Sequence, residues 1–182
     1  MLKNFYSYLK ALSHGEEVLS DRRKFTYIFS SFIFIHVVSV VFFSVLANEL
    51  LIAFNIIAVF LYLGLISLVK KKHFLIVSLI AEMEVLSAVM LISFTYGSML
   101  GYSYYLFAMI PTIFYVASTV KDMKHPNVYC YIFSFLTLLC FFTIIISEPF
   151  FTIPVELSDR PILTLIIRIF NAAVTFFFCI IF

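Results

Sequence analysis

Four ionisable side chains lie inside stretches of the sequence that are otherwise apolar: His36, Glu82, Glu84 and Arg168. Enzymes that use general acid/base catalysis often have two neighbouring carboxylates in the active site. Glu82 and Glu84, however, are two residues apart on a predicted helix, which places them about 200° apart around its axis. They therefore cannot share one face, and the sequence does not favour a paired-carboxylate site.

The charges nevertheless need partners, because a charged side chain at the centre of a bilayer costs roughly 3 kcal/mol. Glu84 lies 13 residues before Gly97 and Arg168 lies 7 residues after Pro161. If Gly97 and Pro161 mark one membrane face, the two depths differ by about 9 Å. We therefore expect Arg168 to contact Glu84 or Glu82 inside the bundle. The alternative is that Arg168 extends to the surface and both glutamates are neutral.

The other polar positions within the apolar stretches indicate packing roles. His36 stands alone, so it is interpreted as a hydrogen-bonding residue and not as a haem or metal ligand. Asn55 and Asn171 are interpreted as interhelical hydrogen-bonding residues. Pro111 should bend its helix and release a carbonyl group.

Gly97 and Gly101 have the GxxxG spacing, but they fall at the end of an apolar run. We interpret them as a tight turn and not as a helix-dimer motif. The sequence contains no phosphate-binding loop, HExxH, GxSxG or selectivity-filter motif. We therefore predict no catalytic residues and no cofactor or metal. Three cysteines in apolar runs are interpreted as small hydrophobic residues: Cys130, Cys140 and Cys179.

The elements that must position these residues are membrane helices. The chain has 182 residues, of which 64% are hydrophobic and only 12% are charged. That composition cannot cover a water-facing surface, since soluble domains have about 25% charged residues. About 20 apolar residues cross a bilayer, and six segments qualify: 25–47, 50–69, 73–96, 102–120, 127–147 and 161–182. The predicted fold is an all-α membrane protein with a six-transmembrane-helix bundle.

Basic residues in short loops predict the orientation. Ten of the twelve basic residues fall on one side of the predicted bundle, and Arg160 alone falls on the other. The ten precede residue 25, join the second and third spans, or join the fourth and fifth spans. We expect that side to be cytoplasmic, so that both termini of a multi-pass inner-membrane protein are cytoplasmic.

The sequence also predicts the structure of the two ends of the chain. Residues 1–24 are predicted to form a cytoplasmic juxtamembrane segment whose residues 2–13 make a short amphipathic helix that ends at Gly15. Residues 25–182 form the transmembrane domain. The loop between residues 147 and 161 is the longest, and Pro149, Pro154 and Pro161 break any helix there. The last span stops at Phe182 without a polar cap, so we expect a longer protein with a cytoplasmic continuation.

The segment from Glu84 to Phe114, "EVLSAVMLISFTYGSMLGYSYYLFAMIPTIF", resembles the signature of a six-helix sensory region that precedes the GGDEF domain in bacterial membrane-bound diguanylate cyclases. Related regions precede class III adenylate and guanylate cyclases. The pattern is a Glu, a Gly-x-x-x-Gly-aromatic turn, a Tyr and a Pro, matched here by Glu84, Gly97, Gly101, Tyr102, Tyr105 and Pro111. The Phe-Asn pairs at 54–55 and 170–171 and the three lysines at 70–72 also match. The resemblance covers about residues 20–182.

One departure from this pattern matters. The related regions carry a His one turn after the Glu, where this chain has Ala88. Ligand chemistry that needs that His is therefore not expected here.

The resemblance implies a sensory and dimerisation domain that controls a cytoplasmic nucleotide cyclase, with the last span near the two-fold axis of a homodimer. It implies ligand or signalling roles for Glu84, Tyr105, Pro111, Arg168 and Asn171, and a small apolar or amphipathic ligand near the first three. The bilayer is the other expected partner, and nucleic acid is not one. The alternatives are a small transporter or channel subunit, with Glu82, Glu84 and Arg168 along its path, and an integral-membrane enzyme.

Overall fold

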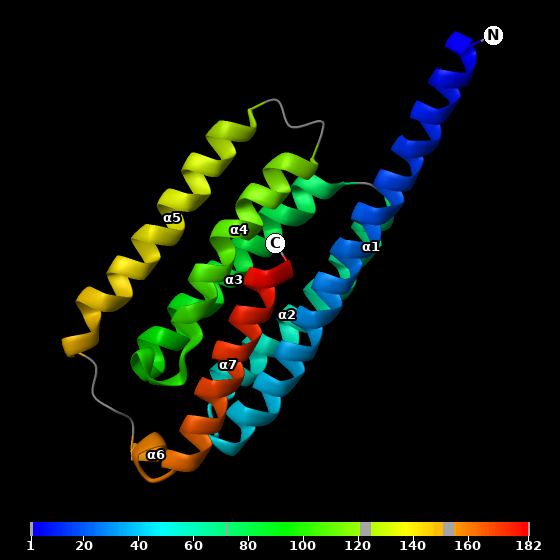
Figure 1. Cartoon of the computed structure of the whole chain (residues 1–182). Helices are drawn as coiled ribbons and strands as arrows, with labels where there is room; N and C mark the ends of the chain where they lie inside the picture. Colours follow the sequence, from blue (N-terminus) through cyan, green and yellow to red (C-terminus); the bar gives the residue numbers. More distant parts are fainter. Residues whose placement is uncertain (1, 72, 121–124, 151–154, 182) are drawn as a thin grey trace. The chain divides into compact units, whose positions relative to one another are not determined.

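The computed structural model describes residues 2–71, 73–120, 125–150 and 155–181, with the backbone alone for residues 2–21, 119, 155–156 and 181. Every element within these ranges is a helix (Figure 1). The α-helices are α1 (Leu2–Val45), α2 (Glu49–Lys70), α3 (Phe74–Tyr96), α4 (Tyr105–Thr119), α5 (Pro126–Ser147), α6 (Val155–Ser158) and α7 (Pro161–Ile181). Three short 3-10 helices are η1 (Gly97–Leu100), η2 (Tyr102–Tyr104) and η3 (Glu148–Phe150).

Five helical segments of the described chain are long and apolar enough to cross a membrane: Arg22–Val45, Glu49–Lys70, Phe74–Leu100, Pro126–Phe150 and Pro161–Ile180. They correspond to five of the six predicted spans. The predicted span 102–120 falls on α4, which has 15 residues. At 1.5 Å per residue α4 is about 22 Å long, shorter than a hydrocarbon core of about 30 Å. The predicted span is longer than α4 because its first three residues form the 3-10 helix η2.

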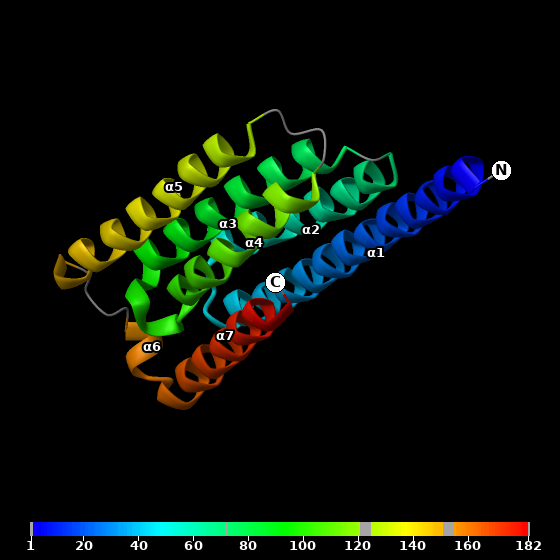
Figure 2. The same cartoon turned by 45° about the horizontal axis from the view of Figure 1, so that its top comes forward.

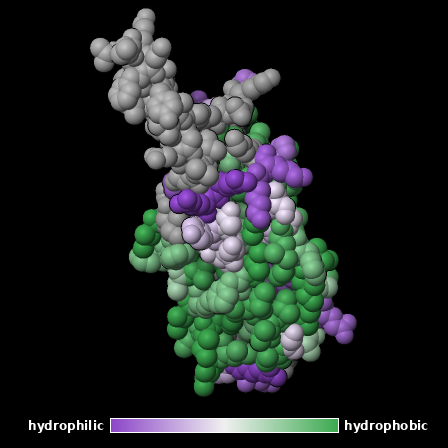
Figure 3. Space-filling model, turned by 90° about the vertical axis from the view of Figure 1, so that its right-hand side faces the viewer, coloured by the Kyte–Doolittle hydropathy of each residue, from purple (hydrophilic) through white to green (hydrophobic). Residues whose placement is uncertain are grey.

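The surface has the polarity expected of a membrane protein. On the face drawn in Figure 3, hydrophobic side chains form a broad band, and hydrophilic side chains gather at its two ends. Many large apolar side chains are exposed on single helices, including Phe60 of α2, Phe135 of α5 and Ile162 of α7. In a bilayer these side chains contact lipid.

The N-terminal helix differs from the expectation. The predicted stop at Gly15 does not occur, since α1 is continuous from Leu2 to Val45. A single glycine inside a helix costs only about 1 kcal/mol. Good helix formers follow it, beginning with Glu16 and Glu17, so this cost does not end the helix.

The chain forms two compact units, residues 1–77 and 78–182. In the first unit α1 and α2 form a helical hairpin (Figure 2). The turn between them has Ala47 in the left-handed region at φ 53°. The side chain of Asn48 accepts a hydrogen bond from the Leu51 amide at 3.0 Å and so caps α2. At the other end of the hairpin, Arg22 donates to the Lys70 carbonyl oxygen at 2.7 Å.

In the second unit α4 packs against α5 and α7, and the 3-10 turns η1 and η2 lie against α7. Prolines begin two of the helices, Pro126 in α5 and Pro161 in α7, where a missing amide proton costs nothing. The buried face of α7 consists of Thr164, Ile167, Asn171, Thr175 and Phe178. Three of these five residues are polar, so the buried face of α7 is partly polar.

Candidate ligand and signalling site

The turn between α3 and α4 depends on two glycines. Gly97 and Gly101 have φ values of 67° and 74°, in the left-handed region that other residues rarely adopt. The Gly101 amide donates to the Ser98 carbonyl oxygen at 3.0 Å, and the Tyr104 amide donates to the Gly101 carbonyl oxygen at 3.1 Å. The chain thereby reverses direction within eight residues and places the side chains of Tyr104 and Tyr105 beside α7.

Asn171 connects α7 to this turn and to α4. The Tyr105 hydroxyl donates to the Asn171 amide oxygen at 2.8 Å, and the Asn171 amide nitrogen donates to the Leu100 carbonyl oxygen at 2.7 Å. Asn171 and Tyr105 are both buried. The interhelical role predicted for Asn171 is therefore observed with named partners: one amide joins three elements of the second unit.

Arg168 lies one turn before Asn171 and contacts the same turn. Its Nε donates to the Tyr104 hydroxyl at 3.0 Å. The stem of its side chain crosses Gly101 so closely that a Cβ built there would be 3.3 Å from the Arg168 Cγ and 2.9 Å from the Tyr104 ring. Only glycine leaves room for this arrangement.

Among the described residues, the polar partner of Arg168 is Tyr104 and not Glu82 or Glu84. Glu84 is 13 residues before Gly97, so it lies about 20 Å along α3 from the turn that Arg168 contacts. The sequence argument assumed that Gly97 and Pro161 lie at one depth. In the structure the turn instead lies beside Arg168 and Asn171, which at 1.5 Å per residue is about 10–15 Å along α7 from Pro161.

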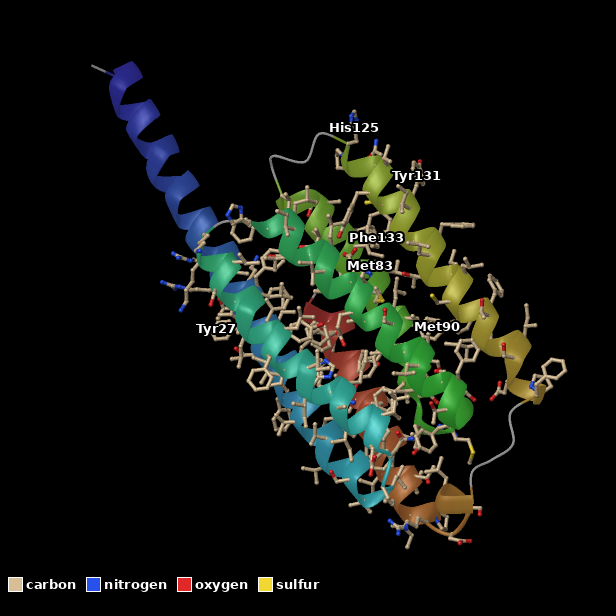
Figure 4. The ribbon with its side chains drawn as sticks, turned by 180° about the vertical axis from the view of Figure 1, so that it is seen from behind. Tyr27, Met83, Met90, His125, Tyr131 and Phe133 are labelled. Carbon is tan, nitrogen blue, oxygen red and sulfur yellow. The ribbon has the colours of Figure 1, made fainter. Side chains whose placement is uncertain are left out.

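Glu82 has a tyrosine partner. Its Oε1 accepts a hydrogen bond from the hydroxyl of Tyr129, near the start of α5. Glu82 is 4% exposed and Glu84 is 9% exposed. The Tyr129 ring packs on Phe133, with centroids 4.9 Å apart. Figure 4 labels Phe133 on α5 and Met83, the neighbour of Glu82, on α3.

The first unit contains a separate polar contact between its two helices. His36 Nδ1 lies 2.8 Å from the Asn55 amide oxygen, and the Asn55 amide nitrogen donates to the Leu51 carbonyl oxygen at 2.7 Å. Because the amide oxygen only accepts, Nδ1 of His36 must carry a proton. The imidazole also stacks on Tyr62, with centroids 5.5 Å apart. Both predicted hydrogen-bonding residues, His36 and Asn55, are partners of each other.

The structure brings four predicted residues together and leaves others apart. Gly101, Tyr105, Arg168 and Asn171 meet at the α3–α4 turn. Pro111 lies within α4, ten residues beyond Gly101, and Glu84 lies far along α3. A pocket made jointly by Glu84, Tyr105 and Pro111 is therefore not supported by these positions.

Sequence reasoning missed three partners: Tyr104, Tyr129 and the Leu100 carbonyl group. The two tyrosines carried a signal, since a phenol inside an apolar helix needs a hydrogen-bond partner. The carbonyl group carried none.

Comparisons of the chain with protein-family profiles, with curated proteins and with solved structures found no match.

Proposed function

We propose that the chain is a membrane-embedded sensory and dimerisation domain that regulates a cytoplasmic nucleotide cyclase attached after α7. A diguanylate cyclase is the first choice, and a class III adenylate or guanylate cyclase is the second. In this proposal the chain crosses a bacterial inner membrane six times, α4 included, and both termini are cytoplasmic. The class of output domain rests on the sequence resemblance at Glu84–Phe114.

The observation that carries the sensory role is the double hydrogen bond of Asn171. It joins α7, the helix that would lead to the output domain, to the turn and to α4. A change at the turn would therefore act directly on the position of α7. In a dimer, that movement would alter the relation of the two α7 helices and of the domains attached to them.

The polar contacts also indicate how a ligand would act. In a membrane an interhelical hydrogen bond contributes about 0.6 kcal/mol on average. A small amphipathic ligand that offered its own polar group to Tyr105 or Asn171 would replace such a bond at little cost. If the ligand bound more tightly to one position of α7, it would shift α7 to that position and change the activity of the attached domain.

A fusion protein tests the proposal. Residues 1–182 are joined to a diguanylate cyclase domain that lacks its own dimerisation segment, and cyclic di-GMP is measured in membranes of a strain without other cyclases. We expect the fusion to be active and Asn171→Leu to change its activity several-fold. Ala172→Leu is the matched control, since it places the same side chain on the exposed face of the same turn of α7.

The result against the proposal is equally definite. An Asn171→Leu fusion that inserts at normal levels and has unchanged activity would remove the sensory role of this contact. Solute flux in proteoliposomes, together with an inactive fusion, would instead favour the transporter or channel.

The topology has its own test. Cysteine introduced at Lys71 and a tag after Phe182 should both be reached only from the cytoplasmic side. Labelling of the two positions from opposite sides would contradict six crossings.

A further inference from the structure

Arg168 is exposed on a helix surface that is otherwise apolar. It is the only charged residue of α7. Its exposed neighbours on the helix are Leu165, Ile166 and Ile169, each more than half exposed. A surface of this composition contacts lipid acyl chains, so the guanidinium group needs an anionic partner there.

Within the part of the chain that the structure describes, the polar contact of Arg168 is made at one nitrogen. Its Nε donates to Tyr104, and its stem is confined against Gly101. A guanidinium group has five N–H donors, so this contact leaves the two terminal nitrogens. Among the residues that the structure describes, none supplies a carboxylate to them. The result is an exposed guanidinium group that is anchored at Nε and keeps donors for a further partner.

The depth of Arg168 suits a lipid headgroup. Arg168 lies 7 residues from the start of α7 at Pro161, about 10 Å along the helix. Side chains on a helix lean toward its N-terminus, and arginine extends its charged end toward the membrane surface. The guanidinium group is therefore carried toward the headgroups of the leaflet at the Pro161 end of α7.

We propose that Arg168, braced by Tyr104, binds the phosphate group of an anionic phospholipid in that leaflet. Guanidinium and phosphate groups pair through two parallel hydrogen bonds, and the exposed Leu165, Ile166 and Ile169 contact the acyl chains. Lysine would not replace arginine here, because its single nitrogen cannot both bond Tyr104 and present a fork. This site is independent of the proposed output domain.

The test uses the whole chain, purified in a mild detergent and freed of lipid. Phosphatidylglycerol, phosphatidylcholine or inorganic phosphate is then added. The lipids bound per chain are counted by native mass spectrometry, and thermal unfolding is measured with each addition. We expect phosphatidylglycerol to bind and to raise the unfolding temperature. Arg168→Gln should weaken its apparent affinity at least about tenfold, since hydrogen bonds to charged groups contribute about 1.5–3 kcal/mol.

Two further variants test whether the lipid binds at Arg168 or is attracted by positive charge in general. Tyr104→Phe keeps the arginine but removes its brace, so it should weaken phosphatidylglycerol binding less than Arg168→Gln does. Arg160→Gln removes an equal charge just before α7 and should leave binding at its normal level. An equal loss with Arg160→Gln would show diffuse charge attraction and overturn the proposal.

Other outcomes identify other occupants. Stabilisation by inorganic phosphate equal to that by phosphatidylglycerol would mean a general anion site without acyl-chain contacts. A lower dimer fraction in Arg168→Gln, with lipid binding unchanged, would mean that a second copy of the chain covers Arg168. Either result overturns the lipid site.

Discussion

Replacing Gly101 by alanine tests whether the α3–α4 turn holds the candidate site together. Gly101 has φ 74°, where an L-residue costs roughly 1–2 kcal/mol. The new Cβ would also lie 2.9 Å from the Tyr104 ring and 3.3 Å from the Arg168 Cγ, so both side chains must move. We expect Gly101→Ala to lower the free energy of unfolding by at least about 1–2 kcal/mol.

A matched control exists in the same chain. Gly64 lies inside α2, and a Cβ built there meets nothing within 4 Å. Gly64→Ala should therefore stabilise the protein by about 0.5–1 kcal/mol. The same substitution is thus expected to have opposite signs at two glycines, which removes any general effect of alanine on membrane insertion.

The assay is reversible unfolding in mixed micelles, in which the fraction of a denaturing detergent is raised and helix content is followed by circular dichroism. The chain has no tryptophan, so tryptophan fluorescence is not an option. Equal unfolding midpoints for Gly101→Ala and the unaltered protein would refute the claim that the turn requires glycine. Equal destabilisation of Gly101→Ala and Gly64→Ala would refute the claim that alanine has opposite effects at these two positions.

Three further substitutions probe local contacts in the same assay. Ala47→Gly should raise stability slightly, by up to about 1 kcal/mol, because Ala47 has φ 53°; a loss of stability would contradict strain at this turn. Tyr105→Phe removes the hydroxyl that Asn171 accepts from and should cost about 0.6–1.7 kcal/mol, whereas no change would mean that the bond contributes nothing. Tyr129→Phe leaves a buried oxygen of Glu82 without its donor and should cost about 1–3 kcal/mol; Tyr131→Phe, on the exposed side of α5, is its control and should be neutral.

Much of the helix layout could be predicted from the sequence because it depends on local properties. Apolar length indicated where five spanning segments lie, and the predicted starts at residues 127 and 161 fall within one residue of the starts of α5 and α7. The exceptions have physical causes. A single glycine did not end α1, and the residues before Tyr105 formed 3-10 turns that shortened α4.

The candidate site was predictable only in part, because axial offsets between helices depend on packing. The sequence identified Asn171 and Arg168 as polar residues that need partners. It did not indicate where along α7 the α3–α4 turn lies, and the proposed contact of Arg168 with Glu84 depended on that offset. Loop residues indicate where each helix ends, but they do not show that the ends of two helices lie at the same depth in the membrane.

The buried face of α7 indicates why this helix suits a signalling role. Within a bilayer the lipid is as apolar as the protein interior, so apolar contacts alone hold a helix weakly. Asn171, the polar residue of this face that bonds other elements, therefore matters more than it would in a soluble core. The two hydrogen bonds of Asn171 together contribute about 1–3 kcal/mol. Allosteric coupling energies span the same range, so a ligand that prefers one position of α7 by two such bonds can change its population by roughly tenfold or more.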